Sequence, residues 1–321
     1  MDVILNKTKS CESTMMRDVF CSALMELAEK DDRIVALDAD LIGASGMKPF
    51  QERFPSRMIQ CGIQEANMVG VAAGLAAVGK RPYAHSFAPF VTRRVMDQLF
   101  ISSAYARLPI TVIGTDPGVA AAFNGGTHMP FEDMAAVCAI PTMTAVEVSD
   151  AVQLKALVPQ INELEVPCYL RLYRKTPRRV YMDGSGFTLG KGVVCREGTD
   201  LSIIASGLMV SAALDAAELL AGEGIRARVV DMFTWKPIDS ELISDCAGKT
   251  GAIVTAENHN VMCGLGAAVA REMSLTVPVP MEMVGVQDRF GEVGTEDFLK
   301  ERLGLTPQVI ADKARKVVLR K

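Results

Sequence analysis

Short apolar runs alternate with longer amphipathic stretches along most of the chain. Residues 15–29 carry apolar side chains at helical spacing, and residues 33–37 (RIVAL) follow as an apolar run of strand length. The same alternation predicts further helices at 65–78, 91–107 and 150–162, and strands at 82–84, 110–115, 143–147 and 168–173. Strands that alternate with helices indicate a parallel sheet covered by helices on both faces.

The composition changes at residues 174–192, where Arg, Gly and Pro accumulate, and the alternation then resumes. Beyond this segment we expect strands at 201–205, 226–231, 252–256 and 282–285, and helices at 210–222, 239–246 and 264–273. The pattern therefore predicts an α/β fold with two three-layer domains. Their expected bounds are 1–178 and 191–321, joined by a linker at 179–190.

Composition and charge exclude several classes of protein. The chain has 321 residues, of which 49% are hydrophobic and 22% charged, so it is long enough for about two domains and is not disordered. Its 34 basic and 38 acidic side chains argue against a nucleic-acid partner. No apolar stretch reaches the roughly 18 residues of a membrane span, so we expect no membrane partner either.

The cysteine pattern and the first residues of the chain indicate where in the cell the protein is expected. The eight cysteines are scattered, without a CxxC pair or zinc-ligand spacing to the three histidines. Residues 1–15 lack an apolar region long enough for a secretory signal. We therefore expect reduced thiols and a cytoplasmic protein.

Glu65 is the first candidate for chemistry, because it opens a helix built almost entirely of Ala, Gly, Val and Leu. One interpretation is a carboxylate that accepts hydrogen bonds at the positive end of the helix. The other is a desolvated carboxyl group that is able to hold or donate a proton. The pattern alone leaves both open.

A second group of candidates lies in loops that follow strands. His128 comes after a Gly-Gly pair and before a helix, which suits either a surface residue or an anion site. Phe87 and Phe90 flank a proline and are either core residues or a stacking platform for a heterocycle. Arg171 and Arg174 end a strand and are either solvated or a phosphate clamp.

Several motifs together resemble those of transketolases that use thiamine diphosphate (ThDP). In chain order they are MMRDVFCSAL, LDADL, GIQEANMVGVAAGLA, HSFAPF, TDPGVAAAFNGGTHMPFED, YLRLYRK, ENHNVMCGLGAAV and DRFGEVG. The resemblance covers nearly the whole chain. It implies a parallel-sheet pyrimidine-binding domain followed by a smaller, mixed-sheet transketolase C-terminal domain.

The family's GDG motif, which marks the diphosphate and magnesium site, is missing from the chain. The chain therefore resembles the C-terminal half of a split transketolase. This implies an N-terminal partner subunit that carries the GDG motif and most Mg²⁺ ligands, so we expect no metal-binding residue in this chain. It also implies an α2β2 assembly with a contact between two copies of this chain, and activity only with the partner.

The resemblance implies roles for four residues around the cofactor ring. Glu65 matches the glutamate that hydrogen-bonds the aminopyrimidine ring and promotes formation of the reactive carbanion. Phe87 and Phe90 match the aromatic residues around that ring. His128, in the motif THMP, matches the histidine that contacts the substrate beside the bond being made or broken. Glu65 and His128 are thus the expected catalytic residues.

Other positions are implied to bind substrate or the rest of the cofactor. Arg17 and Arg174 match arginines that grip a sugar phosphate. Asp40 matches an acidic residue near the cofactor. Ser45 lies at or next to the place of a phosphate-binding serine.

The chain departs from many transketolases near the substrate. Asn124 stands where an aspartate reads a sugar hydroxyl, and Arg93 stands where a tyrosine lies beside the pyrimidine. The implied reaction is transfer of a two-carbon ketol unit from a ketose phosphate to an aldose phosphate. The departures keep an unusual sugar, branched or sulfonated, as an alternative substrate.

Further alternatives are the β subunit of a 2-oxoacid dehydrogenase, a deoxyxylulose-phosphate synthase and a non-catalytic assembly subunit. A nicotinamide-dependent oxidoreductase rests only on the stretch Gly264-Leu265-Gly266, which lacks the third glycine of a dinucleotide fingerprint.

Overall fold

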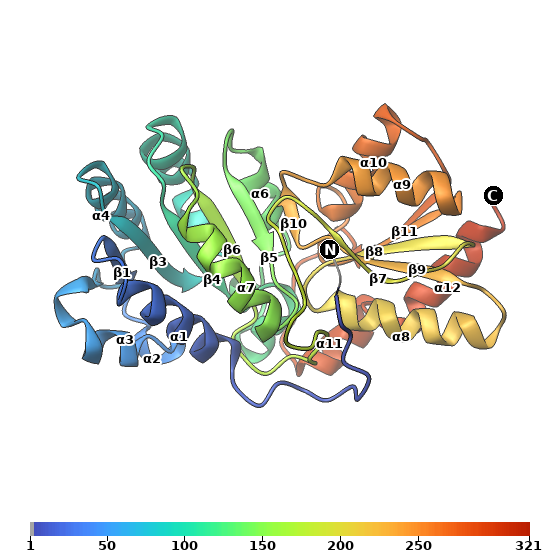
Figure 1. The fold of residues 1–321 in the computed structure, drawn as a ribbon, viewed down its shortest axis with the longest axis horizontal. Helices are drawn as coiled ribbons and strands as arrows, with labels where there is room; N and C mark the ends of the chain where they lie inside the picture. Colours follow the sequence, from blue (N-terminus) through green and yellow to red (C-terminus); the bar gives the residue numbers. More distant parts are fainter. Residues whose placement is uncertain (1–2) are drawn as a thin grey trace.

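The computed structural model describes residues 3–321, which fold into two α/β units lying side by side (Figure 1). The first unit contains a seven-stranded sheet in the order β10-β5-β6-β4-β3-β1-β2. Its strands are β1 (Ile34–Asp38), β2 (Met58–Gln60), β3 (Arg81–Phe87), β4 (Thr111–Thr115), β5 (Thr144–Glu147), β6 (Cys168–Leu172) and β10 (Thr234–Lys236). All neighbours in this sheet are parallel except β10 and β5, which are antiparallel.

Helices cover both faces of this sheet because successive side chains of a strand point to opposite sides. In β1, Ile34 and Ala36 join the core beneath α1 (Met16–Ala28) and α7 (Ala151–Asn162). Their neighbours Val35 and Leu37 join the core beneath α4 (Glu65–Ala77) and α6 (Asp133–Ala139). Strands buried on both faces read as continuous apolar runs, and the three-layer α/β class expected from the sequence is confirmed.

Short helical turns fill the connections of the first unit. They are α2 (Ile42–Ser45), α3 (Lys48–Arg53), η1 (Pro55–Arg57), η2 (Arg93–Val95), α5 (Met96–Gln98), η3 (Leu99–Tyr105), η4 (Gly118–Asn124) and η5 (Gly126–His128). The single helix expected at 91–107 is instead a succession of 3-10, α and π turns. Val91, Val95 and Leu99 are fully buried along this segment.

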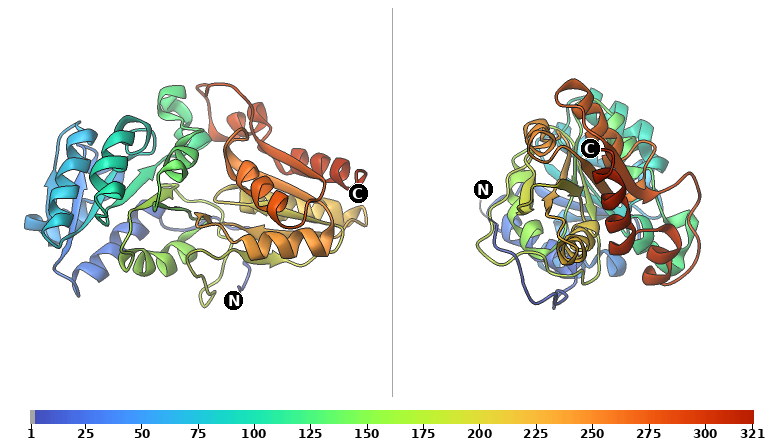
Figure 2. Two further views of the ribbon diagram at one scale, coloured as in Figure 1. Left: turned by 90° about the horizontal axis from the view of Figure 1, so that it is seen from above. Right: turned by 90° about the vertical axis from the view of Figure 1, so that its right-hand side faces the viewer.

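The second unit is built on a five-stranded mixed sheet in the order β12-β11-β8-β9-β7. Its strands are β7 (Val193–Arg196), β8 (Leu201–Ala205), β9 (Ala227–Asp231), β11 (Ile253–Asn260) and β12 (Met281–Val286). Helices α8 (Met209–Gly222) and α12 (Pro307–Val318) pack together beside it, α9 (Ser240–Thr250) and α10 (Leu265–Leu275) contact each other, and α11 (Glu296–Leu303) reaches back to η4. Figure 2 shows these layers from two further directions.

Three strands, β2, β7 and β10, were not expected from the sequence. Strand β2 has three residues and is parallel to β1. Strands β7 and β10 are antiparallel to their neighbours and have four and three residues. Strand β10 belongs to the second half of the chain but pairs with β5 of the first sheet, so the two units share backbone hydrogen bonds. Such pairing between distant segments leaves no local pattern in the sequence.

The chain segment between the units is packed against both of them. Tyr181 and Phe187 are buried, and the Tyr181 hydroxyl donates to Asp231 at 2.7 Å. An isolated bridge joins Tyr181 to Leu5, and Lys9 forms an ion pair with Asp215 of α8. The first residues of the described chain therefore run along the second unit.

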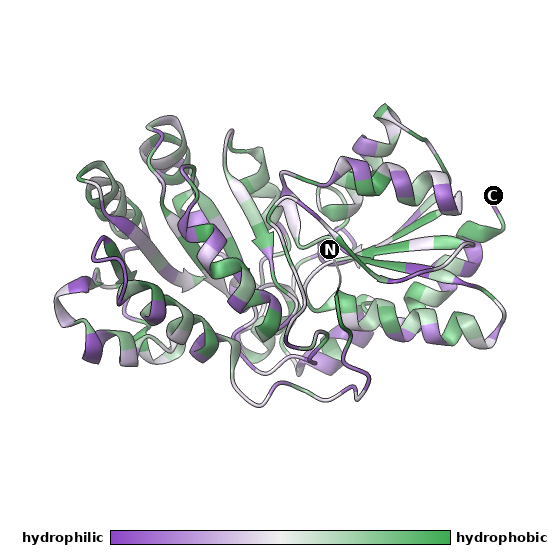
Figure 3. Cartoon of the chain, viewed as in Figure 1, coloured by the Kyte–Doolittle hydropathy of each residue, from purple (hydrophilic) through white to green (hydrophobic). Residues whose placement is uncertain are grey.

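Figure 3 shows that the strands of both sheets are mainly hydrophobic, while polar residues gather on helix surfaces and loops. Among residues 3–321, none of the helices combines the length and the apolar character needed to cross a membrane. All eight cysteines are free thiols.

Candidate functional site

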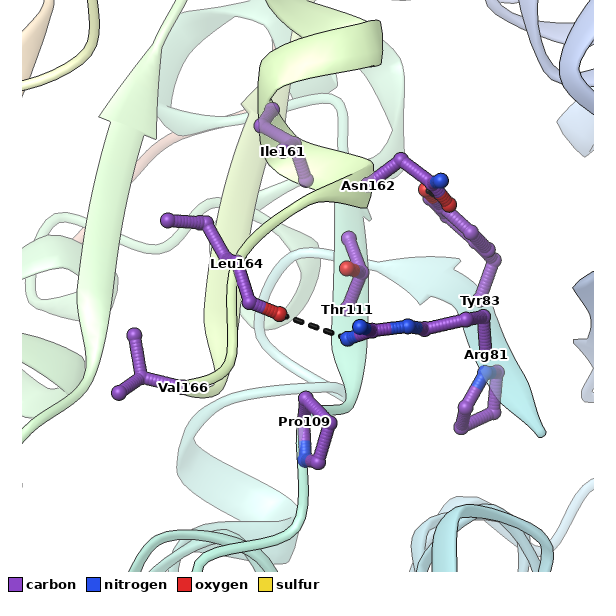
Figure 4. A pocket seen from close by; sticks show the side chains of 9 residues that line it. Arg81, Tyr83, Pro109, Thr111, Ile161, Asn162, Leu164 and Val166 are labelled. Carbon is purple, nitrogen blue, oxygen red and sulfur yellow. Dashed lines mark hydrogen bonds between the residues drawn. The ribbon is translucent and has the colours of Figure 1, made fainter. Parts of the chain in front are cut away.

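The site is built where parallel strands of the first sheet end. Strand β3 ends at Phe87 and β4 at Thr115, and these two residues are partners in the register. Polar loops and the start of α4 meet at this carboxyl edge, which is where ligands bind in sheets of this kind. The pocket in Figure 4 lies at the other edge, because β3 begins at Arg81 and β4 at Thr111. There the Arg81 guanidinium donates to the carbonyl of Leu164 at 2.8 Å.

Glu65 is the first residue of α4 and is only 2% exposed. Its Oε1 accepts a hydrogen bond from the Ser86 hydroxyl at 2.9 Å. Its Oε2 lies 2.6 Å from Nη1 of Arg94. One interpretation of the sequence had backbone N–H groups satisfy this carboxylate, but side chains from β3 and η2 do so instead. The arginine that pairs with Oε2 is half-exposed, so it can leave this buried carboxylate and another hydrogen-bond donor can take its place.

Three aromatic rings form a cluster next to this carboxylate. Phe87 and Phe90 have ring centroids 6.1 Å apart and meet edge to face. The imidazole of His128 lies 5.7 Å from Phe87 and 5.0 Å from Phe90. The end of β3 with the residues that follow it and the turn η5 are thus brought together at this edge of the sheet.

His128 is held in a defined orientation at the end of η5. Its Nδ1 lies 2.9 Å from the Thr127 hydroxyl. Burial, helped by the positive charge of Arg94, lowers the pKa of His128. The imidazole is therefore neutral at pH 7 and keeps one nitrogen as a hydrogen-bond acceptor.

Arg93 and Asp40 lie at the rim of the site. Nη1 of Arg93 is 2.6 Å from Glu132, and its Nη2 donates to the Thr127 carbonyl at 3.3 Å. Arg93 therefore braces the loop that carries His128. Asp40 is exposed and follows β1, whose Asp38 is the register partner of His85 in β3, so it lies at the same edge of the sheet.

Arg17 and Arg174 are held close together through the backbone. The N–H of Arg17 donates to the carbonyl of Arg174 at 3.3 Å. Nε of Arg174 lies 2.7 Å from Asp116, and its guanidinium is 5.3 Å from the Phe87 ring. Burial raises the pKa of Asp116 to about 6, although Arg174 opposes this shift. Arg17 in turn lies 3.6 Å from Asp18, so each of the two arginines has a carboxylate beside it.

Two further candidates, Ser45 and Asn124, lie outside the aromatic cluster formed by Phe87, Phe90 and His128. The hydroxyl of Ser45 is buried and donates to Asp38 at 2.8 Å, so its hydrogen is already engaged inside the fold. Asn124 ends η4 and is exposed on the loop before His128.

Arg171 does not contribute to the site, contrary to the clamp considered from the sequence. It is fully buried and binds Asp133 in a bidentate manner, at 2.7 and 3.0 Å. It also lies 2.5 Å from Glu147 and donates to the Asn258 carbonyl at 3.0 Å. Because Asn258 belongs to β11, this arginine joins the two units.

The stretch Gly264–Gly266 does not form a phosphate-binding turn either. The carboxylate of Glu257 accepts hydrogen bonds from the N–H groups of Leu265 and Gly266, at 2.6 and 2.9 Å. The N-terminus of α10 is therefore filled by the protein's own carboxylate. Within residues 3–321, no group of three or more His, Cys, Asp or Glu side chains has the arrangement of a metal site.

Comparison with known families agrees with this geometry. Residues 12–179 match the pyrimidine-binding domain of transketolase, and residues 190–310 match the transketolase C-terminal domain. The chain belongs to the transketolase family. The family models leave residues 180–189 between them, close to the linker expected from the sequence.

Individual members of the transketolase family match almost end to end. The chain is 51% identical to the 6-deoxy-6-sulfo-D-fructose transketolase subunit SqwH of Clostridium sp. (strain MSTE9), over 97% of this chain and 96% of that one. It is 36% identical to one subunit of the apulose-4-phosphate transketolase of Phocaeicola vulgatus, over 94% and 97%. A solved split-gene transketolase, described as an inactive β4 tetramer, is 40% identical with a TM-score of 0.90, covering 96% of this chain and 100% of that one.

Proposed function

We propose that this chain is the C-terminal subunit of a split, ThDP- and Mg²⁺-dependent transketolase that transfers a two-carbon ketol unit. An N-terminal subunit would carry the diphosphate and Mg²⁺ site, in an α2β2 complex that is active only when both subunits are present. Residues 1–178 would serve as the pyrimidine-binding domain and residues 191–321 as the transketolase C-terminal domain. The observation that carries the proposal is the buried carboxylate of Glu65 beside the rings of Phe87 and Phe90.

These residues fit the aminopyrimidine half of the cofactor. An aminopyrimidine is flat, apolar on its faces and polar at its edge, so it requires aromatic walls and a hydrogen-bonding group to one side. Phe87 and Phe90 offer the walls, and Glu65 offers the carboxyl group. When bound, ThDP supplies a carbon nucleophile and an electron sink for breaking a carbon–carbon bond beside a carbonyl.

Each residue of the chain would then have a defined task. Glu65 would hold a proton at the edge of the aminopyrimidine ring, in surroundings that keep water away from it. His128, neutral at pH 7, would accept a hydrogen bond from a substrate hydroxyl and move a proton there. Asp40 would lie near the cofactor, and Arg93 would keep the His128 loop in place.

The anionic end of the substrate would lie at Arg17 and Arg174. Both arginines already have a carboxylate beside them, since Arg174 pairs with Asp116 at 2.7 Å and Arg17 lies 3.6 Å from Asp18. A sulfonate carries one negative charge, whereas a phosphate monoester carries up to two at pH 7. Together with the 51% identity to the sulfofructose transketolase subunit, this favours 6-deoxy-6-sulfo-D-fructose as the ketose donor.

The experiment is to co-express the chain with a candidate partner that carries a GDG motif and to purify the complex. Ketol transfer is assayed with ThDP and Mg²⁺, from 6-deoxy-6-sulfofructose or from xylulose 5-phosphate, to an aldose phosphate acceptor. We expect product only when both subunits are present, and a higher kcat/KM for the sulfonated donor.

Other outcomes would contradict parts of the proposal. Turnover by this chain alone would show that no partner is required. A preference for xylulose 5-phosphate would retain the reaction and reject the sulfonated donor. A stable complex that binds neither ThDP nor either donor would favour a non-catalytic assembly subunit.

A further inference from the structure

Arg94 occupies a distinctive position in the site. Its guanidinium carbon lies 3.8 Å from the centroid of the Phe90 ring, and Nη1 is 2.6 Å from Oε2 of Glu65. The residue lies in η2, and its own N–H donates to the carbonyl of Pro89 at 3.2 Å, so the backbone there is fixed. The side chain folds back from this turn over the aromatic ring, with 45% of its surface exposed.

A guanidinium and an aminopyrimidine ring have similar requirements. Both are flat, both stack on aromatic faces, and both present N–H donors at an edge. In this structure Arg94 uses the Phe90 face and Oε2 of Glu65 together. The other carboxylate oxygen of Glu65 is engaged by Ser86.

The two groups exclude each other on steric grounds. At 3.8 Å the guanidinium is in van der Waals contact with the Phe90 ring, which leaves no space for a second flat group between them. Arg94 also takes one acceptor position on Oε2 of Glu65, on the side where its guanidinium covers the ring. An aminopyrimidine ring that binds Glu65 and stacks on this face therefore has to displace Arg94.

We propose that Arg94 is a resident competitor of the cofactor, which occupies the aminopyrimidine place and pairs Glu65 until ThDP displaces it. This inference rests on the proposed function. It gives the tandem Arg93–Arg94 two separate tasks: Arg93 braces the loop at Glu132, and Arg94 protects the buried carboxylate of the cofactor-free subunit. The half-exposed stem lets the guanidinium swing into solvent without a change in the fold.

Arg94 lies either on Phe90 and Glu65 or in solvent. The apparent affinity for ThDP is lowered by the ratio of the first population to the second. A half-exposed ion pair together with a cation–π contact favours the position on Phe90 and Glu65 over solvent by about tenfold. Removing the guanidinium should therefore tighten ThDP binding by about tenfold. The same change removes the partner of Glu65, so the cofactor-free protein should melt at a lower temperature.

The test uses Arg94→Met in the assembled complex, with Arg53→Met as the matched control. Arg53 also lies near a phenylalanine, with its guanidinium 5.7 Å from the Phe54 ring, and also pairs with a glutamate, Glu29, at 3.6 Å. It is in α3, away from the residues of the site. ThDP binding in the presence of Mg²⁺ is measured by calorimetric titration, and the melting temperature is measured without cofactor.

We expect Arg94→Met to bind ThDP about tenfold more tightly while it melts earlier than wild type, and Arg53→Met to bind as wild type does. If Arg94 only supported the structure of the site, its replacement would lower both the ThDP affinity and the melting temperature. If the wild-type complex binds ThDP and Arg94→Met binds it equally or more weakly, the proposal that Arg94 competes with the cofactor is overturned. The proposed function is then unaffected. Absence of ThDP binding by all three complexes would reject both proposals.

Discussion

Replacing Arg171 by methionine should destabilise the protein strongly, because this arginine is the shared cation of two buried carboxylates. Asp133 and Glu147 lie 2.7 and 2.5 Å from it, and the side chains of all three residues are at most 4% exposed. Burial alone would raise the pKa of Asp133, but the charge and hydrogen bonds of Arg171, together with His259 and Tyr169, hold that pKa below its usual value. Methionine has a similar length and fills most of the space, so the main loss is the charge.

Removing one partner of a buried ion pair costs about 3–5 kcal/mol. Two carboxylates lose their partner here, so we expect the free energy of unfolding to fall by about 5 kcal/mol. The loss should be larger at pH 8 than at pH 5. Wild-type Asp133 keeps its charge at both pH values, because its folded-state pKa lies below the usual 3.8. In the variant, burial without Arg171 would raise the pKa of Asp133, so protonation would relieve part of the loss at pH 5 but not at pH 8.

The assay is urea unfolding followed by circular dichroism. Arg226→Met is the control, because its ion pair with Asp200 is largely exposed and should be worth less than about 1 kcal/mol. If Arg171→Met is insoluble, the triple variant that adds Asp133→Asn and Glu147→Gln should recover a folded protein, since no buried charge remains unpaired. A loss for Arg171→Met no larger than that of the control would refute the reasoning.

Three further outcomes follow from the structure. Glu65→Gln should fold and assemble normally but lower ketol transfer of the complex by at least about 100-fold, since an amide cannot hold the additional proton; near-normal kcat would remove Glu65 from the mechanism. Arg174→Met should lower kcat/KM for an anionic donor by about 10- to 100-fold, and an equal loss with an uncharged ketose would contradict a role in charge recognition. Asp231→Asn should gain stability relative to wild type as the pH rises from 5 to 8, because burial raises the pKa of Asp231 to about 7 and its ionisation opposes folding over that range; unfolding curves with the same pH dependence as wild type would contradict this.

The apolar pattern predicted the fold class because strands buried on both faces and amphipathic helices leave different periods in the sequence. The helix that begins at Glu65 and the strand that ends at Phe87 were expected within a few residues of their observed bounds. Strand β10 was not, because three residues that pair antiparallel with a segment almost 90 positions earlier carry no periodic signal of their own.

For the site, too, part could be predicted from the sequence and part could not. Its residue types were visible in the sequence: a carboxylate in apolar surroundings, two phenylalanines around a proline, and a histidine after glycines. Their partners were not visible. From the sequence we assigned a role to Arg93 and none to Arg94, yet Arg94 pairs with Glu65 and Arg93 pairs with Glu132.

Arg171 shows the limit most clearly. From its position at the end of an apolar strand we expected a solvated side chain or a phosphate clamp, and both expectations were wrong. Only the packing of the second unit, which brings the carbonyl of Asn258 to within 3.0 Å, decided for burial. The sequence by itself determined which segments form strands and helices, because hydrophobic period is a local property. The tertiary structure decided which charges meet, because an ion pair depends on the distance between segments that the chain order does not specify.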